Sequence, residues 1–226
     1  MNLLSFFDKK DKNIALVCIH GFGRSQSHEY DSFKIALPNY NIIAPNLYNL
    51  EDETDDDWAR WLSKAERVLD QLASEGKSIY LIGYSMGGVI ATYFSNKPNV
   101  KKLVLLAPAF EYITLANALG AVGVLLGNKK KEESTPSLPQ NFTLAFTNLV
   151  NHCKDSAKNI TIPTLMIHGS DDPTISPSTS RKYFDRIPAE KKHLCIIEGV
   201  EHHILSHETE GTLVTELIRS FIEEKF

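Results

Sequence analysis

The sequence has few of the features that mark secreted, disulfide-bonded or nucleic-acid-binding proteins. It contains 3 cysteines in 226 residues, an odd number. Cys18 and Cys195 lie in apolar runs, where a thiol packs as a small hydrophobic group. This usage is typical of a reducing compartment, so we expect a cytoplasmic protein. The formal net charge of -4 excludes a strongly basic surface, and we expect no nucleic-acid partner.

Long hydrophobic runs are also missing. The longest, residues 115–126, is broken by Asn117 and two glycines and is shorter than the ~20 residues that a membrane span requires. The first residues, MNLLSFFDKKDKN, lack a cleavage site of small residues, so we expect neither a signal peptide nor a membrane span. No group of histidines or cysteines has zinc-like spacing, and we expect no metal and no cofactor.

The chain does show an alternation of short apolar runs and amphipathic stretches. Six apolar runs, most of them apolar on both faces, lie at residues 14–19, 40–44, 78–82, 102–106, 164–167 and 193–197. Helical periodicity occurs at residues 27–37, 55–74, 86–95, 178–186 and 207–224. Strands that are apolar on both faces are typical of a parallel sheet covered by helices. The pattern predicts a doubly wound α/β fold in a single domain over residues 1–226.

One segment, at about residues 109–159, breaks this alternation. It contains the apolar stretch 115–126, a basic and proline-containing piece, and a second helical stretch from Phe142. Long excursions from a regular sheet are commonly lids or substrate-binding inserts, so we expect a small helical cap here. The alternative is a pair of helices that only packs on the surface.

The acidic run EDETDDD, residues 51–57, directly precedes a helical pattern. Acidic side chains stabilise the positive end of a helix, and Thr54 followed by Asp57 has the spacing of a capping pair. We therefore predict that Thr54 caps this helix and that the run is not a metal site.

The sequence GYSMG, residues 83–87, stands where an apolar run ends and a helical pattern begins. A sharp turn from strand to helix strains its central residue and crowds the two elements, so glycine is needed on both sides. Ser85 is then a candidate nucleophile, but a serine hydroxyl needs a base, and the base needs an orienting group.

Two later loops can supply these partners. Asp171 and Asp172 follow the apolar run at 164–167, and His202 and His203 follow the run at 193–197. Loops at the carboxyl ends of parallel strands share one edge of the sheet, so both loops should lie near Ser85. The motif HGFG, residues 20–23, follows the first run and adds a glycine-flanked loop that can present the N–H of Phe22. The N–H of Met86, just after the serine, would complete an oxyanion hole.

Together these motifs resemble the α/β-hydrolase superfamily, and within it the small carboxylesterase and monoacylglycerol-lipase-like group, over about residues 14–222. The resemblance implies Asp172, three residues after Gly169, as the acid and His202, three residues after Gly199, as the base. Members often begin with two more strands, for which the residues before Ile14 leave little room. We therefore expect a mostly parallel sheet of six or seven strands, with residues 3–7 as the candidate extra strand.

The expected activity is hydrolysis of small carboxylic esters through an acyl-enzyme intermediate. The apolar stretch of the cap, with Leu115, Leu119 and Val122, would line the acyl side and favour short to medium aliphatic chains. An acyl thioesterase or an aromatic-acid esterase is the alternative within the same chemistry. A non-catalytic ligand-binding protein of the same fold is an alternative of another class. Among the remaining histidines, His20 and His168 are expected to brace backbone turns.

Overall fold

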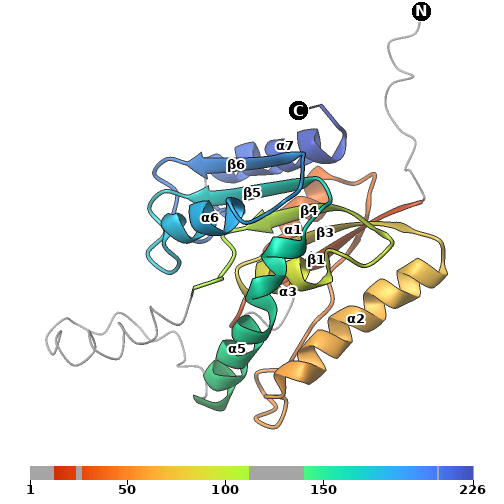
Figure 1. The fold of residues 1–226 in the computed structure, drawn as a ribbon, viewed down its shortest axis with the longest axis vertical. Coiled ribbons are helices and arrows are strands. Elements are labelled where there is room, and N and C mark those ends of the chain that lie inside the picture. Colours follow the sequence, from red (N-terminus) through yellow and green to blue (C-terminus); the bar gives the residue numbers. More distant parts are fainter. Residues whose placement is uncertain (1–12, 24–26, 112–139, 208, 226) are drawn as a thin grey trace, which may run out of the picture.

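The protein, described by a computed structural model over residues 13–23, 27–111, 140–207 and 209–225, is organised around a six-stranded sheet (Figure 1). The strands are β1 (Ile14–Ile19), β2 (Asn41–Ile43), β3 (Ser78–Tyr84), β4 (Val100–Leu106), β5 (Thr164–Gly169) and β6 (Lys192–Ile197). Their order in the sheet is β2-β1-β3-β4-β5-β6, and all neighbouring pairs are parallel. The doubly wound α/β prediction is confirmed, while residues 3–7 lie outside the described part of the chain.

Helices cover both faces of this sheet (Figure 1). One layer contains α2 (Trp58–Ser74), α3 (Met86–Phe94), α5 (Gln140–Cys153), the short helix η3 (Lys154–Asn159) and α6 (Pro177–Phe184). The opposite layer contains the short helix η2 (Ser27–Tyr30), α1 (Asp31–Ala36) and α7 (Glu210–Ile222). The predicted helix at residues 27–37 is thus a short 3-10 turn followed by an α-helix.

The residues of β1 show why its sequence is apolar on both faces. Ala15 and Val17 pack with the layer of α2 and α3, whereas Leu16 and Cys18 pack with the layer of α1 and α7. All four side chains are fully buried. Successive residues of a strand point to opposite faces, so a strand between two helical layers needs apolar residues at every position.

The acidic run before α2 forms a cap, but the capping residue differs from the predicted one. Asp57 is the N-cap of α2, and its Oδ1 accepts hydrogen bonds from the N–H groups of Ala59 and Arg60 at 2.9 and 3.4 Å. The prediction for Thr54 is wrong. Only the residue directly before the helix can reach the free N–H groups of its first turn, and the Thr54 hydroxyl instead binds Asp52 at 2.7 Å.

The predicted cap segment is described at residues 109–111 and 140–159. Residues 112–139 lie outside the described residues, and with them Leu115, Leu119 and Val122. Residues 140–159 form α5 and η3, which pack against α3, and α5 also contacts α2. The side chain of Asn141 bonds the Glu53 carbonyl at 2.9 Å and Asp56 at 3.0 Å, so the start of α5 is tied to the acidic loop.

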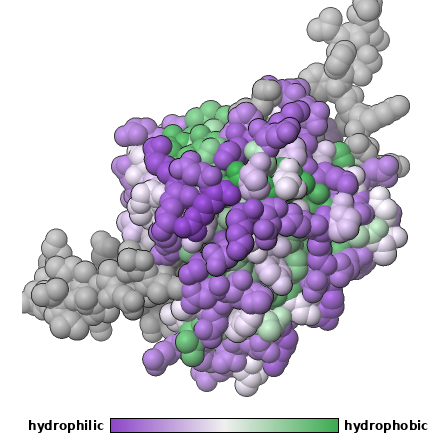
Figure 2. All heavy atoms as spheres, viewed as in Figure 1, coloured by the Kyte–Doolittle hydropathy of each residue, from purple (hydrophilic) through white to green (hydrophobic). Residues whose placement is uncertain are grey.

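The visible face of the molecule is mostly hydrophilic, with scattered hydrophobic patches (Figure 2). Single large apolar side chains such as Ile35 and Leu144 are exposed, which is ordinary for a globular surface. Among the helices within the described ranges, none has the length and apolar character needed to cross a membrane.

Candidate active site

Ser85 occupies a strained turn between β3 and α3. Its backbone has φ 52° and ψ -115°, a region that a non-glycine residue rarely adopts. A Cβ at Gly83 would lie 2.2 Å from the Gly87 carbonyl oxygen, and a Cβ at Gly87 would lie 2.0 Å from that of Ile19. Glycine at both positions therefore lets β3, α3 and β1 approach closely enough to hold the serine in this geometry.

The Ser85 hydroxyl lies at one end of a hydrogen-bonded chain of three side chains. His202 Nε2 is 3.1 Å from Ser85 Oγ, and His202 Nδ1 is 2.6 Å from Asp172 Oδ2. The three residues come from the turns after β3, β5 and β6, whose carboxyl ends share one edge of the sheet. This order of contacts is the one that a serine nucleophile, a histidine base and an orienting carboxylate require.

The Asp172 carboxylate is held by its own loop. Oδ1 accepts hydrogen bonds from the N–H groups of Thr174 and Ile175, both at 2.8 Å, while Oδ2 faces His202 and His168. Burial by itself would raise the pKa of Asp172. The hydrogen bonds from His168 and His202 outweigh it and hold the pKa of this carboxyl well below its usual range. Asp172 therefore stays ionised.

His168 is a site residue that the sequence analysis did not connect with the acid. Its Nε2 lies 3.0 Å from both Asp172 Oδ2 and the Ile175 carbonyl, and its Nδ1 lies 2.6 Å from Ser180 Oγ. Because both neighbours of Nε2 are acceptors, Nε2 carries the proton and Nδ1 accepts from the serine. His168 contacts the backbone, as expected of a residue that braces a turn, and it also fixes the carboxylate that faces His202.

The neighbouring Asp171 and His203 point elsewhere. Asp171 is exposed and its Oδ1 accepts a hydrogen bond from Ser170 at 2.6 Å. His203 is also exposed, and its Nδ1 lies 3.0 Å from the Tyr84 hydroxyl. The residues that the family resemblance implies, Asp172 and His202, lie in the hydrogen-bonded chain to Ser85, whereas Asp171 and His203 lie outside it.

The loop after β1 is fixed on both sides of Phe22. The Gly21 N–H donates to Glu29 at 2.9 Å, and the Gly23 N–H donates to the Tyr48 hydroxyl at 2.7 Å. The N–H groups of Phe22 and Met86 have no acceptor within the described part of the chain. Met86 directly follows Ser85 at the start of α3, and Phe22 lies in the loop after the neighbouring strand β1, so these two amides are the candidates for oxyanion stabilisation.

His20 anchors the start of the same loop. Its Nδ1 donates to the Gly21 carbonyl at 2.8 Å, and its Nε2 accepts from the Leu47 N–H at 3.1 Å. Burial lowers the pKa of His20 to about 4, against a smaller opposing effect of the Gly21 carbonyl. His20 is therefore neutral and uses both ring nitrogens to brace the backbone.

An aromatic cluster packs beside the Phe22 loop. The Phe22 ring stacks on Phe146 of α5 with centroids 4.6 Å apart and an interplanar angle of 12°. Tyr48, Trp61 and Phe142 extend this cluster. The described part of the segment at residues 109–159 is thereby joined to the loop that holds one of the candidate oxyanion amides.

Among the described residues, no group of acidic, histidine or cysteine side chains is arranged to hold a metal ion.

Comparison with known families agrees with this architecture. A family described as "alpha/beta hydrolase fold" matches residues 14–129, just over half of the chain, and the protein belongs to this family. A second family, described as "Serine aminopeptidase, S33", matches residues 128–210, which include Asp172 and His202.

The individual relatives share only low sequence identity with this chain. A Mycoplasma pneumoniae protein that carries the name esterase/lipase 3 is 26% identical, with 82% of this chain and 78% of that protein covered. A thermostable monoacylglycerol lipase of Bacillus sp. strain H-257 is 21% identical, with 84% and 82% covered. A metagenome-derived lipolytic enzyme has the same fold with a TM-score of 0.78 at 17% identity, and 94% of each chain is covered.

Proposed function

We propose that the protein is a serine hydrolase that cleaves carboxylic esters of small, short- to medium-chain acyl substrates. The observation that carries this proposal is the hydrogen-bonded chain from Ser85 through His202 to Asp172, which begins at a strained strand-to-helix turn. Membership of the α/β-hydrolase fold family supports it. So do the relatives, one of which is named as an esterase/lipase and another as a monoacylglycerol lipase.

In the first half-reaction, Ser85 Oγ attacks the ester carbonyl carbon as His202 Nε2 takes the hydroxyl proton. The imidazolium that forms is stabilised by the ionised Asp172, whose Oδ2 accepts a hydrogen bond from His202 Nδ1–H at 2.6 Å and does not take its proton. The carbonyl oxygen becomes an oxyanion that the N–H groups of Phe22 and Met86 stabilise. Collapse of this intermediate expels the alcohol, which receives the proton from His202, and leaves an acyl group on Ser85.

The second half-reaction repeats the same steps with water. His202 takes a proton from a water molecule, and the resulting hydroxide oxygen attacks the acyl carbon. The second tetrahedral intermediate breaks its bond to Ser85 Oγ, which regains its proton from His202. The products are a carboxylic acid and the free enzyme, so no cofactor is consumed.

The acyl preference follows from the cap that we propose at about residues 109–159. Its apolar stretch includes Leu115, Leu119 and Val122, which would contact an aliphatic chain. An ester of an aromatic acid is the second candidate substrate, because Phe22 places a partly exposed aromatic ring in the proposed oxyanion loop. A solved structure with the same fold, Est1E from Butyrivibrio proteoclasticus, has ferulic acid bound.

The decisive experiment combines covalent labelling with a substrate panel. A fluorophosphonate probe should label the wild-type protein at Ser85, because only an activated serine reacts, and should not label Ser85→Ala. Turnover of p-nitrophenyl esters of increasing chain length, feruloyl esters and acyl-CoA thioesters then ranks the candidate substrates. Ser85→Ala should lose several orders of magnitude in turnover while it keeps its circular dichroism spectrum. An unlabelled wild-type protein would favour the non-catalytic ligand-binding alternative.

A further inference from the structure

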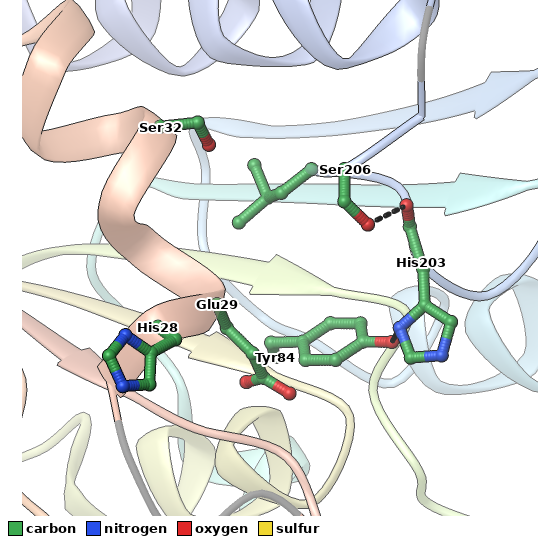
Figure 3. A pocket seen from close by; sticks show the side chains of 7 residues that line it. His28, Glu29, Ser32, Tyr84, His203 and Ser206 are labelled. Atoms are coloured by element: carbon green, nitrogen blue, oxygen red, sulfur yellow. Dashed lines mark hydrogen bonds between the residues drawn. The ribbon is translucent and has the colours of Figure 1, made fainter.

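Tyr84, the last residue of β3, directly precedes Ser85 and places its side chain in the layer of α1 and α7. Only 4% of the residue is exposed. With Glu29, Ser32, His203 and Ser206, it lines a cavity of about 320 Å³ between η2–α1 and the turn that follows His202 (Figure 3). The picture shows the Tyr84 ring lying across the cavity with its hydroxyl beside the His203 imidazole.

The Tyr84 hydroxyl is bonded to the turn that carries the proposed base. It lies 3.1 Å from the backbone carbonyl oxygen of His202 and 3.0 Å from His203 Nδ1. The carbonyl can only accept, and tyrosine has one hydroxyl proton. The two hydrogen bonds can therefore form together only if His203 Nδ1 donates to the Tyr84 hydroxyl and this hydroxyl donates to the His202 carbonyl. The bond to His202 is buried, where a hydrogen bond is less weakened by water.

The ring of Tyr84 also contacts the proposed base and the oxyanion loop. Its centroid lies 5.1 Å from that of the His202 ring. A Cβ built on Gly21 would lie 3.0 Å from Tyr84 Cδ1, so the glycine backbone packs closely on the ring. One side chain thus contacts the histidine turn and the oxyanion loop, while its own backbone is joined covalently to the nucleophile.

We propose that Tyr84 is a positioning residue that sets the distance and direction of His202, and of the loop at Gly21, relative to Ser85. This inference rests on the function proposed above. It does not require Tyr84 to touch the substrate, because its hydroxyl acts on the backbone of the base. Small misplacements of a catalytic base cost large factors in rate, so loss of this hydroxyl should lower kcat more than it changes KM.

The test compares Tyr84→Phe with Tyr80→Phe. Tyr80 lies on the same strand four residues earlier, on the same face of the sheet and away from Ser85, with Lys102 over its ring. Both substitutions remove one hydroxyl and keep the ring. Tyr84→Phe should lower kcat by about tenfold, because one hydrogen bond that holds His202 in place for the reaction is lost. KM should change by less than about twofold, because Tyr84 does not bind the substrate. Tyr80→Phe should keep the wild-type kcat.

A second readout does not depend on turnover. The His202 Nδ1 proton, which lies in the 2.6 Å contact with Asp172, should give a low-field proton resonance in NMR spectra. In Tyr84→Phe this resonance should shift and exchange faster with water, while in Tyr80→Phe it should stay as in the wild type. The two readouts separate failure of the positioning role from failure of the proposed function.

If the wild type hydrolyses esters and Tyr84→Phe matches Tyr80→Phe in kcat and in this resonance, the positioning role is overturned. If no ester or thioester is hydrolysed by the wild type, the proposed function fails, and the resonance alone then decides whether Tyr84 orders His202.

Discussion

Two carboxylates lie side by side in the loop after β5, and their surroundings are opposite. Asp172 is buried and accepts hydrogen bonds from two backbone N–H groups and two histidines, whereas Asp171 is exposed beside Ser170. A carboxylate must be ionised and fixed to orient a histidine, and of these two only Asp172 meets both conditions.

This difference predicts the effects of two matched substitutions. Asp172→Asn places an amide opposite His202 and favours the wrong tautomer, so it should lower kcat by about 10⁴, as in serine proteases. Asp171→Asn should change kcat by less than about threefold because its side chain does not face the imidazole. Steady-state kinetics on a p-nitrophenyl ester measures both, and an Asp171→Asn variant with the larger loss would show that the acid is misassigned.

The two histidines of the next turn give a second comparison at the residue scale. His202 contacts Ser85 and Asp172, while His203 contacts Tyr84 from the exposed side. His202→Ala should lose nearly all fluorophosphonate labelling, because nothing then takes the serine proton. His203→Ala should label at close to the wild-type rate, since Tyr84 can still donate to the His202 carbonyl. Equal labelling of both variants would contradict the role of His202.

At this scale the sequence predicts some residues and not others. The flanking glycines identify Ser85 in the sequence, because the close approach of the backbones of β1, β3 and α3 requires glycine on both sides of it. The choices of Asp172 and His202 over their neighbours depend on family resemblance, since spacing alone does not decide which way a loop turns. The sequence places Tyr84 beside Ser85 and His168 four residues before Asp172, but it does not show that the Tyr84 hydroxyl bonds the His202 turn or that the His168 ring bonds the Asp172 carboxylate. These contacts depend on the direction of each side chain in the fold.

At the scale of elements, the junction of β1, β3 and α3 is one of the tightest backbone contacts near the site. Gly87→Ala would place a Cβ 2.0 Å from the Ile19 carbonyl oxygen, so α3 or β1 must move. We expect a loss of about 3 kcal/mol in the free energy of unfolding, with reduced activity because β1 leads into the proposed oxyanion loop. Urea denaturation measures this change.

Gly76 provides the control for this substitution. It follows α2 with φ 73°, and a Cβ there would meet nothing within 4 Å. Gly76→Ala should cost about 1 kcal/mol from backbone strain alone and leave activity unchanged. If the two variants were equally stable, the close packing of α3 on β1 would not be a constraint on this fold.

The sequence predicts most of the strands and helices, but it predicts their end residues less well. All six strands were expected from apolar runs, because burial between two helical layers requires continuous apolar sequence. The cap of α2 was misassigned to Thr54 because a run of acidic residues offers several candidates and only the chain path selects Asp57. The first strand pairs with both β2 and β3, and this order depends on pairing between strands that the sequence does not display.

For the whole molecule, the buried His20, at the start of the proposed oxyanion loop, predicts how stability depends on pH. The pKa of His20 falls from an ordinary value of 6.5 to about 4 in the folded protein, so the unfolded chain binds a proton that the folded protein does not. The free energy of unfolding therefore keeps its full value, as far as His20 is concerned, above pH 6.5. It falls by about 3 kcal/mol as the pH is lowered toward 4. Asp172, whose pKa is lowered on folding, adds stability that is lost only below about pH 3.8.

Urea denaturation between pH 7 and 4 measures this slope. His20→Gln should be less stable at pH 7, because it weakens the contacts to Gly21 and Leu47, but its stability should fall less steeply with pH. Parallel curves for the wild type and the variant would mean that His20 does not carry the effect.

The position of β6 in the sheet affects when the site is completed during synthesis and when it is lost during unfolding. β6 is the last strand in the sheet order, its residues are mostly half-buried, and the turn after it carries His202. The contact between Ser85 and His202 joins residues 117 apart in the chain. During synthesis, the turn at Ser85 is therefore made long before His202, the proposed base, has been added to the chain. In hydrogen exchange, β6 and its turn should open at lower free energy than β3, so mild denaturant should abolish turnover before the central strands unfold.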